Sequence, residues 1–121
     1  MTSLPASSPD QYRVSVIIPH FNMPDALARC LASVQAQVLE GAVEIIVVDN
    51  GSRQMPTEVV AAHPGVILLS EPTPGPGPAR NAGVAVARAP VLAFIDADCW
   101  AGDGWLKAAV EAVEAGGTRA V

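Results

Sequence analysis

Short runs of hydrophobic residues alternate along this chain with segments whose hydrophobic residues recur every three or four positions. The runs are rich in β-branched residues, which is typical of strands buried on both faces. They occupy residues 14–19, 43–48, 66–69 and 91–95, and each ends at a turn signal or at polar residues. The pattern therefore predicts four short strands inside the molecule.

The segments between these runs have the period of amphipathic helices. The first helix is expected to begin at residue 22 or 23 and to end at Gly41. Shorter helices are predicted at residues 57–63 and 79–88. Asp103 is expected to cap a last helix, whose hydrophobic side chains share one face.

Strands that alternate with helices, and that are hydrophobic almost throughout, indicate an α/β fold. We expect a Rossmann-like open parallel sheet in the strand order 3-2-1-4, with helices on both faces. Ligands of such sheets bind outside the carboxyl ends of the strands. The rule gathers the following residues along one edge: His20, Phe21, Asn22, Asp49, Asn50, Glu71, Asp96 and Asp98.

Length and charge limit the possible functions. The chain has 121 residues, half of them hydrophobic, which is enough for one compact domain and too short for two. Its net charge is −5, and its seven Lys and Arg residues are scattered, so no basic stripe exists to bind a nucleic acid. The segment after the first predicted strand also lacks the Gly-x-Gly-x-x-Gly motif of nicotinamide-dependent dehydrogenases.

The ends and the cysteines suggest where the protein works. Residues 1–12 are rich in Ser and Pro and contain no hydrophobic run suited to a signal peptide or a transmembrane segment. We expect them to form a flexible leader before one domain at residues 13–121. Cys30 and Cys99 lack the spacing of a disulfide framework or a zinc site, which favours reduced thiols in a cytoplasmic protein.

The fourth predicted strand ends in two carboxylates one residue apart, Asp96 and Asp98. Carboxylates that leave an extended segment in this way can lie near one point. Their oxygens suit Mg²⁺ or Mn²⁺, which proteins usually hold with one or two carboxylates plus the phosphates of a substrate. Acidic pairs are also common in ordinary turns, so the motif indicates a metal site only together with the rest of the edge.

Residues 71–78, which include four prolines, could be mistaken for a phosphate-binding loop. Such a loop works through consecutive backbone N–H groups, and four prolines among eight residues remove half of these donors. We therefore predict a stiff, extended lead-in to the helix at residues 79–88.

Four motifs in a fixed order resemble those of the family 2 glycosyltransferases, which have the GT-A fold. They are VSVIIPHFN at 14–22, EIIVVDNGS at 44–52, PARNAG at 78–83 and AFIDADCW at 93–100. The resemblance covers about residue 13 to the end of the chain. It implies that the chain is the amino-terminal half of such an enzyme, the half that binds a nucleotide sugar.

The resemblance also implies roles for single residues in a cleft that binds a nucleoside diphosphate sugar. Pro19 and Phe21 would border the nucleoside, and Asp49 would hydrogen-bond the base or the ribose. Arg80 would reach the base or a phosphate. Asn50 stands where the family frequently has a second Asp, so the identity of the base is left open.

The acidic motif would complete this site. Asp96 and Ala97 would belong to the nucleotide-sugar site, with Asp96 near the ribose and the metal-bound waters. Asp98 would ligate Mg²⁺ or Mn²⁺ directly. A divalent cation that bridges two phosphates neutralises the charge that develops as the nucleoside diphosphate leaves.

The implied reaction is an inverting, metal-dependent transfer of a sugar to an unknown acceptor, which could be a saccharide, a lipid-linked molecule or a protein. In this family the general base lies well beyond the Asp-x-Asp motif, so we expect it beyond Val121. Glu111 and Glu114 fall on the last predicted helix, where a solvated face is favoured over catalysis. We expect the chain alone to be inactive. The alternative is a non-catalytic nucleotide-binding module, or a fragment that needs a partner segment.

The fourth predicted strand would lie at one border of the sheet. Residues 91–95 contain no charge, proline or glycine of the kind that protects an exposed edge. Unpaired backbone groups on such a strand recruit other strands. We therefore expect self-association through this edge.

Overall fold

The computed structural model describes residues 11–116, which form one four-stranded parallel sheet and four helices. The elements in chain order are β1 (Tyr12–His20), α1 (Pro24–Gln35), β2 (Ala42–Asp49), α2 (Thr57–Ala61), β3 (Ile67–Ser70), α3 (Pro76–Val86), β4 (Val91–Phe94) and α4 (Trp105–Gly116). The strand order is β3-β2-β1-β4, which confirms the predicted fold class and order. No helix within residues 11–116 has the length and hydrophobicity needed to cross a membrane.

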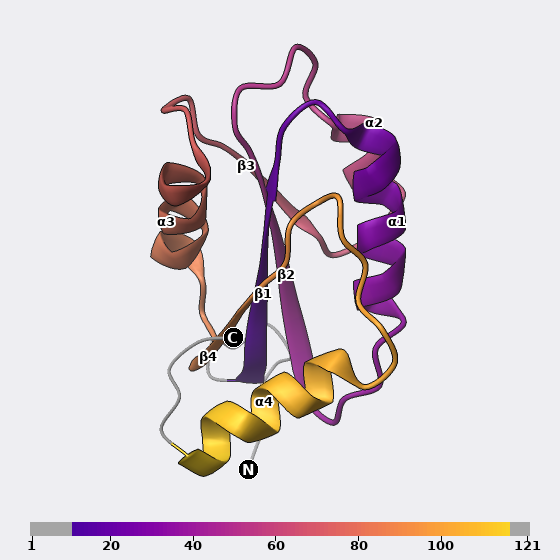
Figure 1. Ribbon diagram of the computed structural model, residues 1–121, viewed down its shortest axis with the longest axis vertical. Coiled ribbons are helices and arrows are strands. Elements are labelled where there is room, and N and C mark those ends of the chain that lie inside the picture. Colours follow the sequence, from indigo (N-terminus) through magenta and orange to yellow (C-terminus); the bar gives the residue numbers. More distant parts are fainter. Residues whose placement is uncertain (1–10, 117–121) are drawn as a thin grey trace, which may run out of the picture.

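The sheet is covered on both faces. Helix α3 lies on one side of it, and α1 and α2 lie on the other (Figure 1). In β1, Val16 and Ile18 pack towards Leu27 of α1, whereas Ile17 packs towards Ala79 of α3. Successive side chains of a strand point to opposite faces, so a strand covered on both sides must be hydrophobic throughout.

The carboxyl ends of the strands meet at one edge. His20, the last residue of β1, is the register partner of Asp49 in β2, and Asp49 is the partner of Ser70 in β3. The ladder continues past the strands, because the N–H of Asn50 donates to the carbonyl of His20 at 2.9 Å. The loops that follow these strands therefore begin side by side.

Two element boundaries near the prolines and the leader differ from the prediction. Helix α3 begins at Pro76, three residues early, because Pro76 and Pro78 occupy its first turn, where a missing N–H costs no hydrogen bond. Part of the predicted extended lead-in is therefore helix. Tyr12, predicted as the end of the leader, is the first residue of β1, and residues 1–10 lie outside the described part.

Gln37 explains two further differences. Helix α1 ends at Gln35 rather than Gly41, and Nε2 of Gln37 donates to the carbonyl of Ser33 near the end of that helix. The same side chain reaches α4, where its Oε1 accepts the N–H of Leu106 at 3.0 Å. Asp103, predicted as the cap, lies two residues before the helix begins.

Helix α3 approaches the sheet closely at Gly83. A Cβ added there would lie 2.6 Å from Cγ2 of Ile17 and 3.2 Å from its Cγ1. Both Ile17 and the neighbouring Val48 are fully buried, so neither can move aside without disturbing the core.

We expect Gly83→Ala to destabilise the protein, although alanine normally favours a helix by about 1 kcal/mol over glycine. Overpacking of a filled core costs about 1–3 kcal/mol, which exceeds that gain. Gly77→Ala, in the same helix, is the matched control, because no described atom would lie within 4 Å of its added Cβ. Urea unfolding of both variants measures the difference, and equal stabilities would contradict the close packing.

Candidate functional site

A cavity of about 490 Å³ opens at the carboxyl ends of β1 and β4, beside the start of α3. Small-molecule sites have volumes of roughly 300–1,000 Å³, so the cavity can hold a ligand of that size. It is lined by Pro19, His20, Phe21, Met23, Asn50, Pro74, Gly75, Pro76, Ala79, Arg80, Asp96, Ala97 and Asp98. Of the residues that the resemblance assigns to the site, all but Asp49 lie in this lining, and two other residues of the predicted edge, Asn22 and Glu71, also lie outside it.

Sequence reasoning did not name Met23, Pro74, Gly75, Pro76 or Ala79, which complete the lining. Four of these lie where the chain passes from β3 into α3. The rule that ligands bind outside the carboxyl ends of the strands could have predicted them, because the loop after β3 also begins at such an end. Gly75, with φ 115°, makes a turn there that favours glycine.

A tight turn after β4 presents the two carboxylates of the Asp-x-Asp motif. The N–H of Cys99 donates to the carbonyl of Asp96 at 2.9 Å and closes the turn. Ala97, between the two acids, is buried in the core. Because the middle residue points inward, both acidic side chains are left at the surface.

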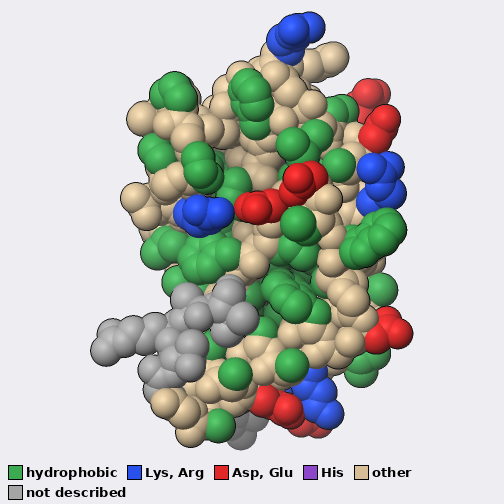
Figure 2. Space-filling model, in the orientation of Figure 1, with side chains coloured by type: hydrophobic (Ala, Val, Ile, Leu, Met, Phe, Trp, Pro, Cys, Tyr) green, Lys and Arg blue, Asp and Glu red, His purple; other side chains and the backbone are tan. Residues whose placement is uncertain are grey.

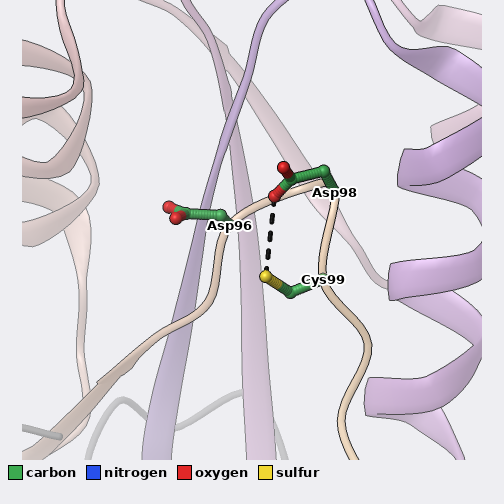
Figure 3. Close-up of side chains that lie close together, drawn as sticks. All are labelled: Asp96, Asp98 and Cys99. Atoms are coloured by element: carbon green, nitrogen blue, oxygen red, sulfur yellow. Dashed lines mark hydrogen bonds between the residues drawn. The ribbon is translucent and has the colours of Figure 1, made fainter.

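Three potential metal ligands gather on this turn. One oxygen each of Asp96 and Asp98, together with Sγ of Cys99, lie within 4.8 Å of one another (Figure 3). Sγ of Cys99 donates a weak hydrogen bond to Oδ1 of Asp98 at 3.5 Å, and this carboxylate raises the pKa of the thiol. Exposed carboxylate oxygens fit a hard divalent cation such as Mg²⁺ or Mn²⁺.

Arg80 of α3 lies beside Asp96 in the lining of the cavity. Its Nη2 lies 3.5 Å from Oδ1 of Asp96, and the two side chains are 41% and 58% exposed. Figure 2 shows acidic and basic side chains side by side near the middle of this face, among hydrophobic surface. An ion pair this exposed contributes at most about 1 kcal/mol to stability, so these charges remain available to a ligand.

Asp49 lies beneath this surface in a hydrogen-bonded cluster. Its side chain is 1% exposed, and Oδ1 accepts hydrogen bonds from Nδ1 of His20 at 2.8 Å and from Oγ of Ser52 at 2.6 Å. Oδ2 accepts the N–H of Ser52 at 3.0 Å. Nε2 of His20 accepts the N–H of Met23 at 3.1 Å, so the hydrogen of the ring lies on Nδ1.

This cluster joins the loop after β1 to the loop after β2. Oγ of Ser52 also accepts the N–H of Asn22, and Oδ1 of Asn22 accepts the N–H of Arg53, both at 2.8 Å. Burial opposes ionisation of Asp49, but the hydrogen bonds from Ser52 and His20 outweigh it and lower the pKa of the carboxyl. Asp49 therefore holds two loops of the cavity together, and its direct contact with the base or the ribose stays a prediction.

The sequence and the structure both resemble known sugar-transferring enzymes. The sequence model described as Glycosyl transferase family 2 matches residues 15–121. Glycosyltransferase AglE of Haloferax volcanii is 33% identical over 114 residues, which cover 89% of this chain and 38% of that protein.

Solved structures agree with the sequence comparison. The structure of S. aureus TarS 1-349 in complex with UDP has a TM-score of 0.74 and 25% identity, covering 84% of this chain and 32% of that one. The mannosyltransferase PcManGT from Pyrobaculum calidifontis, in complex with GDP-Man and Mn²⁺, has a TM-score of 0.72 and 27% identity, covering 88% and 34%. These likenesses confirm the predicted GT-A fold, and the chain spans about a third of the length of these relatives.

We expect Asp49→Asn to lower the free energy of unfolding by about 1–3 kcal/mol at pH 7, because the new NH₂ group would face the N–H of Ser52. The folded-state pKa of Asp49 is lowered, so its carboxylate stabilises the fold above the unfolded pKa of about 3.9 and loses this effect as pH falls through the folded pKa. The gap between wild type and variant should therefore narrow below about pH 4.

Urea unfolding at several pH values measures this gap. Asp103→Asn, which changes an exposed carboxylate, is the matched control and should leave stability nearly unchanged. A gap for Asp49→Asn that stays constant down to pH 3 would show that the carboxylate is not held in its ionised form.

Proposed function

The chain belongs to glycosyl transferase family 2, and we propose from this premise that it holds the donor-binding part of an enzyme that transfers a sugar from a nucleoside diphosphate sugar to an acceptor. One observation carries the proposal. A cavity at the carboxyl ends of the strands is lined by two exposed carboxylates, Asp96 and Asp98, and by the cation of Arg80, whose Nη2 lies 3.5 Å from Oδ1 of Asp96. Diphosphates are bound by cations of the protein and by a metal held on carboxylates.

Two hydrophobic residues of the lining suit a nucleoside. Pro19 lies near the end of β1 and Phe21 directly follows that strand, and Phe21 is 52% exposed although it is a large hydrophobic residue. An exposed aromatic ring that lines a cavity can pack against a planar base. We assign Pro19 and Phe21 to the nucleoside, and Asp96 and Ala97 to the nucleotide sugar.

We propose that Arg80 and the two acids bind the diphosphate together, Arg80 directly and the acids through a metal ion. We assign Asp98, together with Asp96, as the residues that would hold Mg²⁺ or Mn²⁺. When bound, this cation neutralises negative charge on the leaving nucleoside diphosphate. Arg80 reaches into the same space from α3 and can donate to a phosphate oxygen or to the base.

Asp49 is proposed to act on the nucleoside through the loops that it holds. Both of its oxygens already accept hydrogen bonds from His20 and Ser52. The bond between His20 and the N–H of Met23 fixes the loop that carries Phe21. Loss of Asp49 is therefore expected to weaken a nucleoside and its diphosphate by similar factors.

The nature of the donor and the acceptor is left to experiment. TarS is described with UDP and PcManGT with GDP-Man, so relatives of this fold bind different bases. We propose an inverting reaction whose general base lies beyond Val121. In the described part of the chain, Glu111 and Glu114 both lie on α4, and Glu114 pairs with Arg13 at 2.9 Å. A cytoplasmic location remains a prediction, as does a flexible leader before β1.

Binding of a nucleoside diphosphate should require a divalent cation and Asp98. We expect Asp98→Asn to weaken binding at least about tenfold, because a neutral amide is a poorer ligand for Mn²⁺ than a carboxylate. Asp103 is an exposed carboxylate in the next turn, and Asp103→Asn should bind the nucleoside diphosphate as tightly as wild type. Calorimetry with UDP and GDP, in Mn²⁺ and in EDTA, measures this, and unchanged EDTA-insensitive affinity in Asp98→Asn would refute the metal site.

Turnover separates an enzyme from a binding module. We propose that the 121 residues alone transfer sugar far more slowly than a complete enzyme, because loss of a general base forfeits roughly two to four orders of magnitude. Nucleotide binding without any release of nucleoside diphosphate from a donor sugar would favour the alternative, a non-catalytic module or a fragment that needs a partner segment.

We also propose that the chain associates with itself through β4. Within residues 11–116, β4 pairs with β1 on one side and with no described strand on the other. Light scattering after size exclusion should show mass that rises with concentration, and Leu92→Lys in β4 should reduce it. Val84→Lys, an exposed position on α3, is the control. A monomer at every concentration would refute the association.

A further inference from the structure

Asn50, the residue after β2, uses its side-chain amide to form hydrogen bonds with the backbone of residues 71–75. Its Nδ2 donates to the carbonyls of Glu71 at 2.9 Å and Thr73 at 2.8 Å. Its Oδ1 accepts the N–H of Gly75 at 2.8 Å. Three hydrogen bonds thus tie the segment between β3 and α3 to the end of β2.

These partners leave the amide one orientation. If its oxygen and nitrogen were exchanged, the oxygen would face two carbonyl oxygens and the NH₂ group would face the N–H of Gly75. In the observed orientation both N–H donors of Asn50 are used. Although Asn50 lines the cavity, it can offer a ligand no donor without releasing the segment.

The segment depends on such outside partners. Pro72, Pro74 and Pro76 have no N–H, so residues 71–76 have few donors with which to form hydrogen bonds of their own. The N–H of Glu71 donates to the carbonyl of Asp49, and that of Thr73 donates to the side chain of Glu71. The N–H of Gly75, where φ of 115° makes the turn before α3, goes to Asn50.

The same segment forms one wall of the cavity. Pro74, Gly75 and Pro76 line it, and α3 begins at Pro76 and carries Arg80 one turn later. A displacement of Gly75 would therefore move both the wall and the start of the helix that holds Arg80.

We propose that Asn50 is a positioning residue of the donor site, whose amide holds residues 71–76 in place so that the cavity is formed before a nucleoside diphosphate binds. The proposal rests on the proposed function for its ligand but not for its geometry. An aspartate at this position would not serve, because an ionised carboxylate has no N–H and would face the carbonyl oxygens of Glu71 and Thr73.

The expected loss of affinity follows from the fraction of molecules in which the cavity is formed. Apparent affinity falls in proportion to the fraction of molecules that are competent to bind, so a wall in place in about a tenth of molecules weakens binding about tenfold. None of the three bonds involves the turn after β4, which carries the carboxylates Asp96 and Asp98. Affinity for Mn²⁺ alone should therefore not change.

The test uses Asn50→Ala, which removes the three bonds without adding charge, and Asn81→Ala, an exposed position on α3, as the matched control. Calorimetry gives the affinity for whichever of UDP or GDP wild type prefers, and electron paramagnetic resonance gives that for Mn²⁺ alone. Amide hydrogen exchange by NMR reports on Gly75. We expect about tenfold weaker nucleotide binding, unchanged Mn²⁺ binding and faster exchange at Gly75 in Asn50→Ala only.

Asn50→Asp supplies a pH signature. A protonated carboxyl group can donate one hydrogen bond, so the stability deficit of this variant relative to wild type should shrink as pH falls towards about 4. The deficit of Asn50→Ala should stay constant. The carbonyl oxygens of Glu71 and Thr73 should raise the folded-state pKa of the new carboxyl, so its penalty should be full above that pKa and should be lost as pH falls towards the unfolded pKa of about 3.9.

Three outcomes decide the proposal. Wild-type affinity and wild-type exchange at Gly75 in Asn50→Ala would overturn it, as would equal losses of nucleotide and Mn²⁺ affinity, which indicate general disruption. If wild type binds no nucleotide, the proposed function fails. Exchange at Gly75 then still shows whether Asn50 holds the wall.

Discussion

The structure depends on a central strand that is buried on both faces. β1 pairs with β2 on one side and β4 on the other, and its residues from Val14 to Ile18 are fully buried. Helices cover both faces of the sheet, so polar groups near this strand are accommodated mainly at its two ends. Near each end of β1, a buried carboxylate of the neighbouring strand β2, Glu44 or Asp49, joins separate parts of the chain.

Both carboxylates are held in the ionised form by hydrogen bonds that they accept, but they connect different segments of the chain. At the amino end, Glu44 of β2 accepts hydrogen bonds from Oγ of Ser15 and from the N–H and Nε of Arg88. Burial opposes its ionisation, but these bonds outweigh burial and lower the pKa of Glu44, as they do for Asp49 at the other end. Glu44 fastens the connection from α3 to β4, whereas Asp49 fastens loops that border the cavity.

Sequence reasoning predicted the fold well because local patterns determine it. The hydrophobic runs place all four strands, and the edge rule brings Phe21, Asn50 and Asp98 to one cavity. It could not predict contacts between distant residues. Gln37 receives the N–H of Leu106, which lies 69 positions away, and no local pattern distinguishes that amide from any other exposed one.

The misplaced start of α3 and the burial of Asp49 have physical reasons of the same kind. Prolines favour extended backbone unless they stand in the first turn of a helix, and the local sequence fits both for Pro76 and Pro78. A carboxylate at a strand end can face solvent or turn inward. Asp49 turns inward because His20 and Ser52 supply donors for both of its oxygens.

Some polar side chains of this site are used in hydrogen bonds within the protein, whereas others are left exposed to a ligand. Asp49 is buried and accepts three hydrogen bonds, and both side-chain N–H donors of Asn50 are used, so these two groups serve the shape of the cavity. Arg80, Asp96 and Asp98 are exposed or half-exposed, and within residues 11–116 the side-chain contacts of Arg80 with Asp96 and of Asp98 with Cys99 are long, at 3.5 Å. Under the proposed function these charged groups would therefore take the diphosphate and the metal, whereas Pro19 and Phe21 would take the nucleoside. The hydrogen bonds of Asp49 and Asn50 join the loops that surround the cavity.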